Sequence, residues 1–153
     1  FDSAAYVEGA FPVFSGIFAV AMAHEVGHTV AALARNVKIS LPFLIPNGQL
    51  GTFGSITQIK SIPKTREDLF DVAIAGPIAG TTVASVLFAY GLSLSLNGDP
   101  SELLPIPAEL FNGSLLLGSI SQLFFGEAGQ SQSGVLVHPL FVAGWYDGYF
   151  YGL

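Results

Sequence analysis

One short segment, His24-Glu25-Val26-Gly27-His28, combines residue types at a spacing that could do metal chemistry. Two histidines at positions i and i+4 lie on one face of a helix, where both imidazoles can bind the same metal ion. The glutamate that follows the first histidine can reach a water molecule on that metal and act as a general base. The segment therefore predicts a Zn²⁺ site in which His24 and His28 are metal ligands and Glu25 is catalytic.

This motif lies in an apolar stretch from Phe11 to Ala34, in which His24, Glu25 and His28 are the only ionisable side chains. A helix crosses the hydrocarbon core of a bilayer with about 20 apolar residues, so the stretch is long enough to span a membrane. Ionisable groups inside such a segment are energetically costly, which makes a functional role the default interpretation. The sequence predicts a zinc hydrolase whose active site lies within the membrane.

The composition of the whole chain also favours a membrane protein. Of its 153 residues, 51% are hydrophobic and 10% are charged, against about 25% charged residues in an ordinary soluble domain. The mean hydropathy is +0.60. A net charge of -6 gives no indication of nucleic-acid binding. Because the chain has no cysteine, disulfides, iron–sulfur clusters, thiolate zinc sites and a cysteine nucleophile are excluded, and any metal ligands should be histidines and carboxylates.

Two long helices and an intervening hairpin should position the motif. We expect the first helix to have Pro12 in its first turn and to end near Arg35-Asn36. Residues 37–60 predict a β-hairpin or looped sheet, with short strands near 37–41 and 56–59 and turn residues at 46–48. The stretch from 41 to 57 is uncharged, which suits backbone shielded at membrane depth.

A second helix should begin after Thr65, which is typical of an N-cap, with Asp68 completing a capping box. Residues 72–96 carry no charge and predict a second membrane span. Residues 97–134 indicate a loop with an interfacial or re-entrant helix, and 135–153 form a third apolar segment. We therefore expect a membrane α-helical fold, with residues 1–153 as a single domain that is a fragment of a longer protein.

The cations give this fold an orientation. All five lie between the two long helices, which by the positive-inside rule places that loop on the cytoplasmic or stromal side; they are Arg35, Lys38, Lys60, Lys64 and Arg66. At about 1.5 Å per helical residue, a metal at His28 would lie about 10 Å below that surface.

A catalytic zinc needs a third protein ligand and an open position for water. Glu67 and Asp71 could supply a carboxylate, as in a soluble zincin, although both also suit the first turns of a helix. Asp147 is the one acid in the last apolar stretch, and His138 precedes a proline where a helix should begin. The residues alone leave these alternatives open.

Several segments, in this order, carry a resemblance to a known family: 24–28, 49–57, 66–70 and 75–80. Together they resemble the site-2 protease family of intramembrane zinc metalloproteases. The similarity runs from about Ala21 to Trp145 and is nearest to the cyanobacterial and plastid branch, which includes plant proteases named for ethylene-dependent gravitropism deficiency and yellow-green leaves. It implies a membrane-embedded zinc endopeptidase in a plastid or cyanobacterial membrane. The resemblance makes residues 1–153 an intramembrane metalloprotease core domain, with a membrane-associated β-hairpin at 37–60 beside the active site. The implied partners are the lipid bilayer and transmembrane protein substrates.

The chain departs from that family at the third ligand. The family uses the aspartate of a Leu-Asp-Gly motif on a later helix, whereas this chain reads Tyr146-Asp147-Gly148 soon after Trp145 and stops at Leu153. Either the ligand lies beyond Leu153 or the chain is a degenerate form. The alternative function is therefore a non-catalytic pseudoprotease or membrane scaffold that lacks the third zinc ligand.

Overall fold

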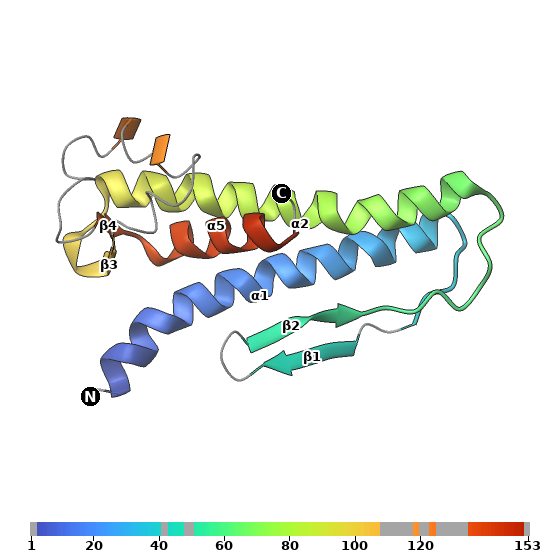
Figure 1. Cartoon of the computed structure of the whole chain (residues 1–153), viewed down its shortest axis with the longest axis horizontal. Helices are drawn as coiled ribbons and strands as arrows, with labels where there is room; N and C mark the ends of the chain where they lie inside the picture. Colours follow the sequence, from blue (N-terminus) through green and yellow to red (C-terminus); the bar gives the residue numbers. More distant parts are fainter. Residues whose placement is uncertain are drawn as a thin grey trace.

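The computed structural model describes residues 3–40, 43–47, 51–107, 118–119, 123–124 and 135–151. Three helices lie alongside one another: α1 (Ser3–Ala34), α2 (Arg66–Asn97) and α5 (Pro139–Tyr151). A hairpin of β1 (Phe43–Asn47) and β2 (Gly51–Ile56) runs beside α1, which it contacts through β2 (Figure 1). The predicted predominance of helix, with a small sheet between the first two long helices, is confirmed.

Helix α1 is longer than expected. It begins at Ser3, so that Pro12 lies inside the helix and the predicted start in the turn around Pro12 is wrong. A proline removes one intrahelical hydrogen bond but does not prevent helix on its N-terminal side, where Ala4 and Ala5 are good helix formers. Within this part of α1, the hydroxyl of Ser15 donates to the carbonyl of Pro12 at 2.9 Å.

The predicted end of α1 near Arg35-Asn36 is confirmed. Asn36 has a φ of 55°, in the left-handed region that asparagine tolerates better than most residues. The backbone N–H of Val37 then donates to the carbonyl of Ala32 at 2.8 Å, which is the hydrogen bond of a Schellman cap. This cap turns the chain away from the helix axis and towards the hairpin.

The hairpin is present, but its strands lie nearer the turn than the sequence predicted. Residues 43–47 and 51–56 pair antiparallel, with Pro46 and Asn47 inside β1 rather than in the turn. The predicted strands at 37–41 and 56–59 are joined by one isolated bridge, between Ile39 and Ile59. Near this bridge, the carbonyl of Lys38 accepts from two successive amides, those of Lys60 and Ser61. Gly48 lies outside the described residues.

Helix α2 begins as predicted. The Thr65 hydroxyl accepts from the Asp68 N–H at 3.0 Å, and the Asp68 carboxylate accepts from the Thr65 N–H at 3.1 Å, which completes the capping box. By length and composition, two helices among the described residues are apolar and long enough to cross a membrane: Ala10–Ala34 within α1, and Arg66–Asn97. They contain the two apolar stretches, 11–34 and 72–96, that the sequence predicted to be long enough to span a membrane.

The C-terminal part packs against the far end of α2. A 3₁₀ turn, η1 (Pro100–Glu102), leads to β3 (Leu104–Ile106), which pairs antiparallel with β4 (Val135–Val137). The predicted interfacial or re-entrant helix falls mostly on 108–117, 120–122 and 125–134, which lie outside the described residues.

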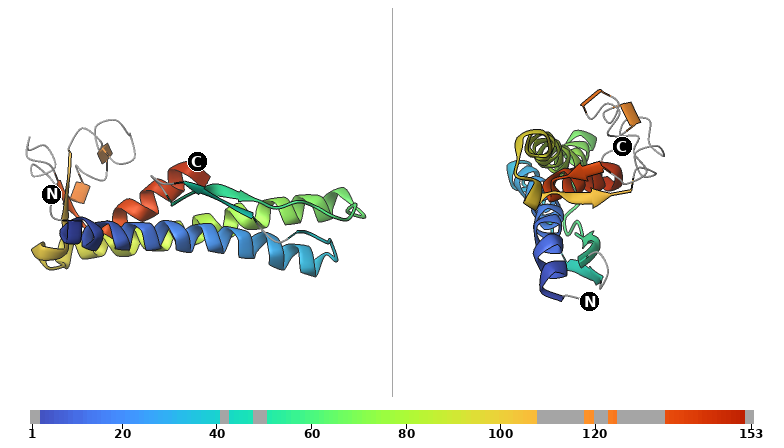
Figure 2. Two further views of the ribbon diagram at one scale, coloured as in Figure 1. Left: turned by 90° about the horizontal axis from the view of Figure 1, so that it is seen from below. Right: turned by 90° about the vertical axis from the view of Figure 1, so that its left-hand side faces the viewer.

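The third apolar segment forms α5, whose 13 residues are fewer than the about 20 needed to span a membrane. Phe141 is 2% exposed and stacks on Phe88 with ring centroids 4.7 Å apart. The backbone of α5 approaches α2 closely at Gly91, where an added Cβ would lie 2.2 Å from the amide nitrogen of Phe141. The two further views in Figure 2 show α5 lying against the long helices.

Candidate metal centre

The structure brings His24 and His28 together on one face of α1. Their Nε2 atoms lie 3.1 Å apart, and the two rings meet edge to face with centroids separated by 4.8 Å. Two nitrogens that bind one tetrahedral zinc at 2.0–2.1 Å are about 3.3 Å apart. The residues present therefore fit two ligands of a single zinc ion, with the Nε2 atom of each ring as the donor.

The orientation of the His28 ring is fixed from α2. Its Nδ1–H donates to the backbone carbonyl of Val72 at 2.7 Å. A hydrogen bond at Nδ1 leaves Nε2 of the neutral ring as the lone-pair atom, and metal-binding histidines usually have such a partner on their other nitrogen. The carbonyl of Val72 thus selects the tautomer that can bind a metal.

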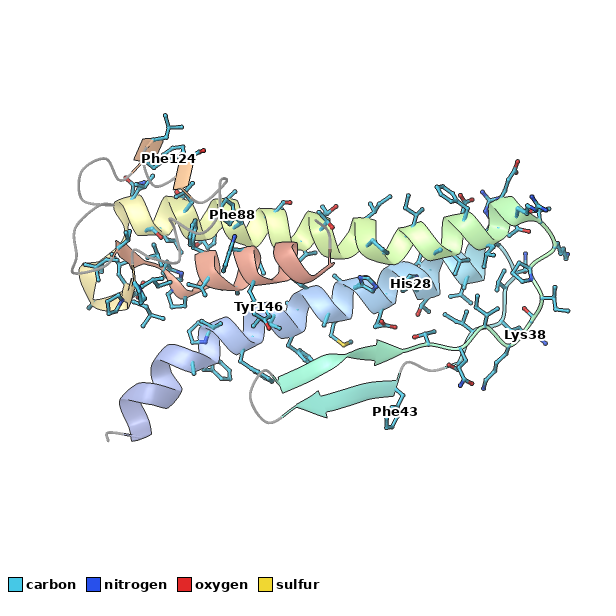
Figure 3. All side chains as sticks on the ribbon, in the orientation of Figure 1. His28, Lys38, Phe43, Phe88, Phe124 and Tyr146 are labelled. Atoms are coloured by element: carbon cyan, nitrogen blue, oxygen red, sulfur yellow. The ribbon has the colours of Figure 1, made fainter. Side chains whose placement is uncertain are left out.

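Close approach of the helices makes this hydrogen bond possible. A Cβ added to Gly76 of α2 would lie 2.2 Å from His28 Nε2, so the imidazole occupies the space that a side chain would take. One turn along, a Cβ on Gly80 would lie 3.3 Å from His24 Cβ. Figure 3 shows the labelled His28 between the ribbons of α1 and α2.

Glu25 is a buried carboxylate beside the histidine pair. The residue is 7% exposed, and its Oε2 accepts a hydrogen bond of 2.8 Å from the hydroxyl of Thr57, which follows directly after β2. The hydroxyl of Thr29 contacts the same residue elsewhere, donating to the backbone carbonyl of Glu25 at 2.9 Å. The side chain of Glu25 is therefore held from the hairpin, and its main chain from within α1.

The other candidate ligands do not join the histidine pair. No group of three or more histidines and carboxylates among the described side chains could hold one metal ion. The Asp71 carboxylate accepts from the guanidinium of Arg35, which also lies 3.7 Å from Asp68. A surface hollow of about 300 Å³ lies near the capped end of α1 and is lined by Arg35, Arg66, Glu67, Phe70 and Asp71. The soluble-zincin arrangement with Glu67 or Asp71 is therefore not formed.

His138 occupies the start of α5, as predicted from the proline that follows it. Its Nδ1 accepts from the N–H of Leu140 at 3.2 Å, and its own N–H donates to the Ser95 hydroxyl at 2.8 Å. Its Nε2 lies 3.9 Å from the carboxylate of Glu102. His138 therefore caps the N-terminus of α5, and its own N–H ties this end of α5 to α2. Asp147 belongs to α5, but its side chain lies outside the described residues.

Three contributors to this centre were not predicted from the sequence: the hydroxyl of Thr57, the carbonyl of Val72 and the bare backbone of Gly76. Thr57 is 32 residues from Glu25, and Val72 is 44 residues from His28. No residue spacing along the chain indicates such pairs. The similarity of 49–57 and 75–80 to family motifs marks the segments that contain Thr57 and Gly76. It does not indicate which residues these segments contact.

Comparisons with known proteins identify the same family as those motifs. The family model of peptidase family M50 matches residues 12–147. The probable zinc metalloprotease EGY1, chloroplastic, of Oryza sativa subsp. japonica is 47% identical over 141 residues, which are 92% of this chain and 24% of the relative. The Arabidopsis thaliana protein of that name is 44% identical over 141 residues, covering 92% of this chain and 26% of its own length.

A second Arabidopsis thaliana relative, the probable zinc metalloprotease EGY2, chloroplastic, is 38% identical over 124 residues, covering 80% of this chain and 22% of the relative. The chain thus spans about a quarter of the length of these curated relatives. No solved structure matches the chain.

Proposed function

This chain belongs to peptidase family M50, as its resemblance to the site-2 protease family predicted, and we propose that it forms the metal-binding part of an intramembrane zinc endopeptidase. The reaction is hydrolysis of peptide bonds in or near the transmembrane segments of membrane proteins. The observation that carries this proposal is the pair of Nε2 atoms 3.1 Å apart on His24 and His28, with the buried carboxylate of Glu25 beside them.

In this proposal His24 and His28 hold the zinc ion through Nε2, in the tautomer that the Val72 carbonyl selects for His28. When bound, zinc supplies Lewis-acid activation of a water molecule and of the scissile carbonyl. Glu25 accepts the proton of the attacking water on its carboxylate and delivers it to the nitrogen of the departing amine. The burial of Glu25 limits access of bulk water to this proton.

The third ligand is proposed to be an aspartate, either Asp147 or one beyond Leu153. Helix α5 runs from the far end of α2 towards the middle of α1 (Figure 1). It meets α1 where a Cβ on Gly16 would lie 2.6 Å from the Cβ of Ala143, and Asp147 is one helical turn further along. A carboxylate from this direction would complete a His₂Asp set, with one position left open for water.

The setting of this chemistry is proposed to be a plastid membrane. The relatives are named chloroplastic, and the histidine pair lies inside the apolar segment Ala10–Ala34. That segment exposes large apolar side chains along its length, which a bilayer would cover; they include Phe11, Phe14, Phe18, Met22, Val26, Val30 and Leu33. Four of the five cations lie in the connection between the two long helices and the fifth, Arg66, is the first residue of α2, consistent with a stromal side for this end.

The alternative is a non-catalytic member of the family that binds transmembrane segments without cutting them. It is favoured by one observation: the chain reads Tyr146-Asp147-Gly148 directly after Trp145, which differs from the family's Leu-Asp-Gly on a later helix. In that case Glu25 would have no catalytic task, and replacing it would leave every measurable property except local packing unchanged.

Metal analysis and one pair of variants test the proposal. The full-length protein, purified in detergent, should contain about one zinc per chain and cleave a quenched-fluorescent peptide that carries a Leu- and Ala-rich transmembrane segment. Glu25→Gln should retain zinc and fold but lose about 100- to 10,000-fold in kcat, since removing the base removes general-base catalysis. Glu67→Gln, which neutralises an exposed acid outside the centre, should behave as the unsubstituted protein. Failure to bind zinc, or equal activity of both variants, would exclude the enzyme.

A further inference from the structure

We propose that Thr57 is a positioning residue for Glu25, so that the β-hairpin sets the orientation of the general base. This inference rests on the proposed function, because it assigns Thr57 a part in the reaction of the same centre. The contact that carries it is the 2.8 Å hydrogen bond from the Thr57 hydroxyl to Glu25 Oε2. Thr57 itself does not touch the reacting atoms in this arrangement.

The contact restrains the Glu25 side chain at one of its two carboxylate oxygens. A glutamate has three side-chain torsions, and α1 by itself fixes only the backbone from which they start. A hydrogen bond from a neutral hydroxyl to a carboxylate is short and stronger than one between neutral groups, and exclusion of water strengthens it further. The hydrogen bond from Thr57 therefore holds Oε2 of the carboxylate in a defined position.

Small displacements of a general base have large effects on rate. A base must lie within hydrogen-bond reach of the proton it takes, and a misplacement of about 1 Å can cost about 100-fold in rate. Thr57 lies directly after β2, so its position depends on how the hairpin packs beside α1 (Figure 3). The hairpin thereby acts on the chemistry through one hydroxyl, in addition to any role in covering the site.

Thr29 provides a matched control within the same structure. Its hydroxyl also contacts Glu25, at 2.9 Å, but the acceptor is the backbone carbonyl and the bond lies within one turn of α1. Removing this hydroxyl deletes a hydrogen bond of similar length at the same residue without freeing the carboxylate. A purely structural role for Thr57 predicts that the two substitutions are equivalent, whereas a positioning role predicts that they differ.

The kinetic test uses the full-length protein in detergent and the same quenched-fluorescent transmembrane peptide. Thr57→Val keeps the side-chain shape without the hydroxyl and should lower kcat about 10- to 100-fold, with KM within about twofold. Thr57→Ser restores the hydroxyl and should recover most of kcat. Thr29→Val should stay within about twofold of the unsubstituted protein in both constants. An unchanged kcat for Thr57→Val, an equal loss in Thr29→Val, or no recovery with serine would overturn the inference.

A second measurement does not depend on activity. Thr57→Val should lower Tm when Glu25 is present. In a Glu25→Ala background the same substitution should lower Tm clearly less, because the hydrogen bond to Glu25 is absent there before Thr57 is changed. Zinc content should be unchanged by Thr57→Val, since the hydroxyl contacts neither histidine ligand in this proposal. Equal Tm shifts in both backgrounds would show that Thr57 and Glu25 are not coupled. Absence of Glu25-dependent cleavage in the unsubstituted protein would instead overturn the proposed function, and this inference with it.

Discussion

Substitution of Gly76 by alanine should separate zinc binding from folding. The new Cβ would lie 2.2 Å from His28 Nε2 and 2.5 Å from both Cδ2 and Cε1. Non-bonded atoms of this kind rest about 3.5 Å apart, so the imidazole must move by about 1.3 Å relative to α2. Metal–ligand distances tolerate about 0.2 Å, so a displacement of this size removes His28 from the zinc.

The expected change in zinc affinity follows from the loss of His28 as a ligand. Loss of a supporting contact around a metal typically costs 10- to 100-fold in affinity, so loss of a ligand should exceed about 100-fold. The methyl group also overpacks the α1–α2 contact, at about 1–3 kcal/mol, unless His28 gives up its 2.7 Å hydrogen bond to Val72 and swings away. We expect Tm to fall by a few degrees, while zinc affinity falls by more than about 100-fold.

The assay is a zinc titration against a competing chelator, with thermal unfolding followed in the same detergent. Gly80→Ala is the matched control, because its Cβ would lie 3.3 Å from His24 Cβ and 3.4 Å from Nδ1, a contact that a shift of a few tenths of an ångström relieves. It should change zinc affinity by less than about 10-fold. A Gly76→Ala protein that binds zinc like the unsubstituted one would refute the placement of His28 against the backbone of α2.

Two further predictions concern the ends of the helices on either side of the hairpin. Asn36→Val places a β-branched residue at a φ of 55° and should destabilise the fold by about 1–2 kcal/mol, whereas Asn36→Gly should be neutral or stabilising; denaturant midpoints that rank the two in the opposite order would exclude the α1 cap. Thr65→Ala removes the hydroxyl that accepts from Asp68 and should cost about 1 kcal/mol. Thr65→Ser should retain most of that stability, and a loss equal to that of alanine would argue against the capping box.

Features set by neighbouring residues could be predicted from the sequence. The start of α2 follows from Thr65 and Asp68, three residues apart, and the end of α1 follows from the polar pair Arg35-Asn36. The approach of His24 and His28 follows from helical periodicity, which places residues i and i+4 side by side. In each case the interacting groups lie within one helical turn, so local geometry determines the outcome.

Features that depend on distant segments could not be predicted. The alternation around Ile39 and Ile59 is a real strand signal, yet packing of the hairpin leaves these residues joined by a single bridge and places the ladder at 43–47 and 51–56. Pro12 marks a favourable helix start, but the preceding residues are also compatible with helix and extend it to Ser3. A local sequence pattern indicates which secondary structures a segment can form, and tertiary contacts determine which of them it adopts.

The candidate centre shows why the pentapeptide is insufficient to define an active site. Helix α1 places the three side chains on neighbouring positions, but it fixes neither the tautomer of His28 nor the direction of the Glu25 carboxylate. The first is set by α2, through Val72, and the second by the hairpin, through Thr57. Because these two constraints come from different elements, a substitution that removes one should leave the other in place.

The two constraints can therefore be distinguished by what each variant retains. Gly76→Ala should lose zinc and, with it, all turnover, while the bond between Thr57 and Glu25 stays intact. Thr57→Val should keep zinc at full occupancy and lose only kcat. If both variants lost zinc together, the hairpin and α2 would act as one unit and the separation of metal binding from base orientation would be wrong. If Gly76→Ala loses zinc and Thr57→Val loses kcat while keeping zinc, two elements outside the motif, α2 and the hairpin, assemble the centre on α1.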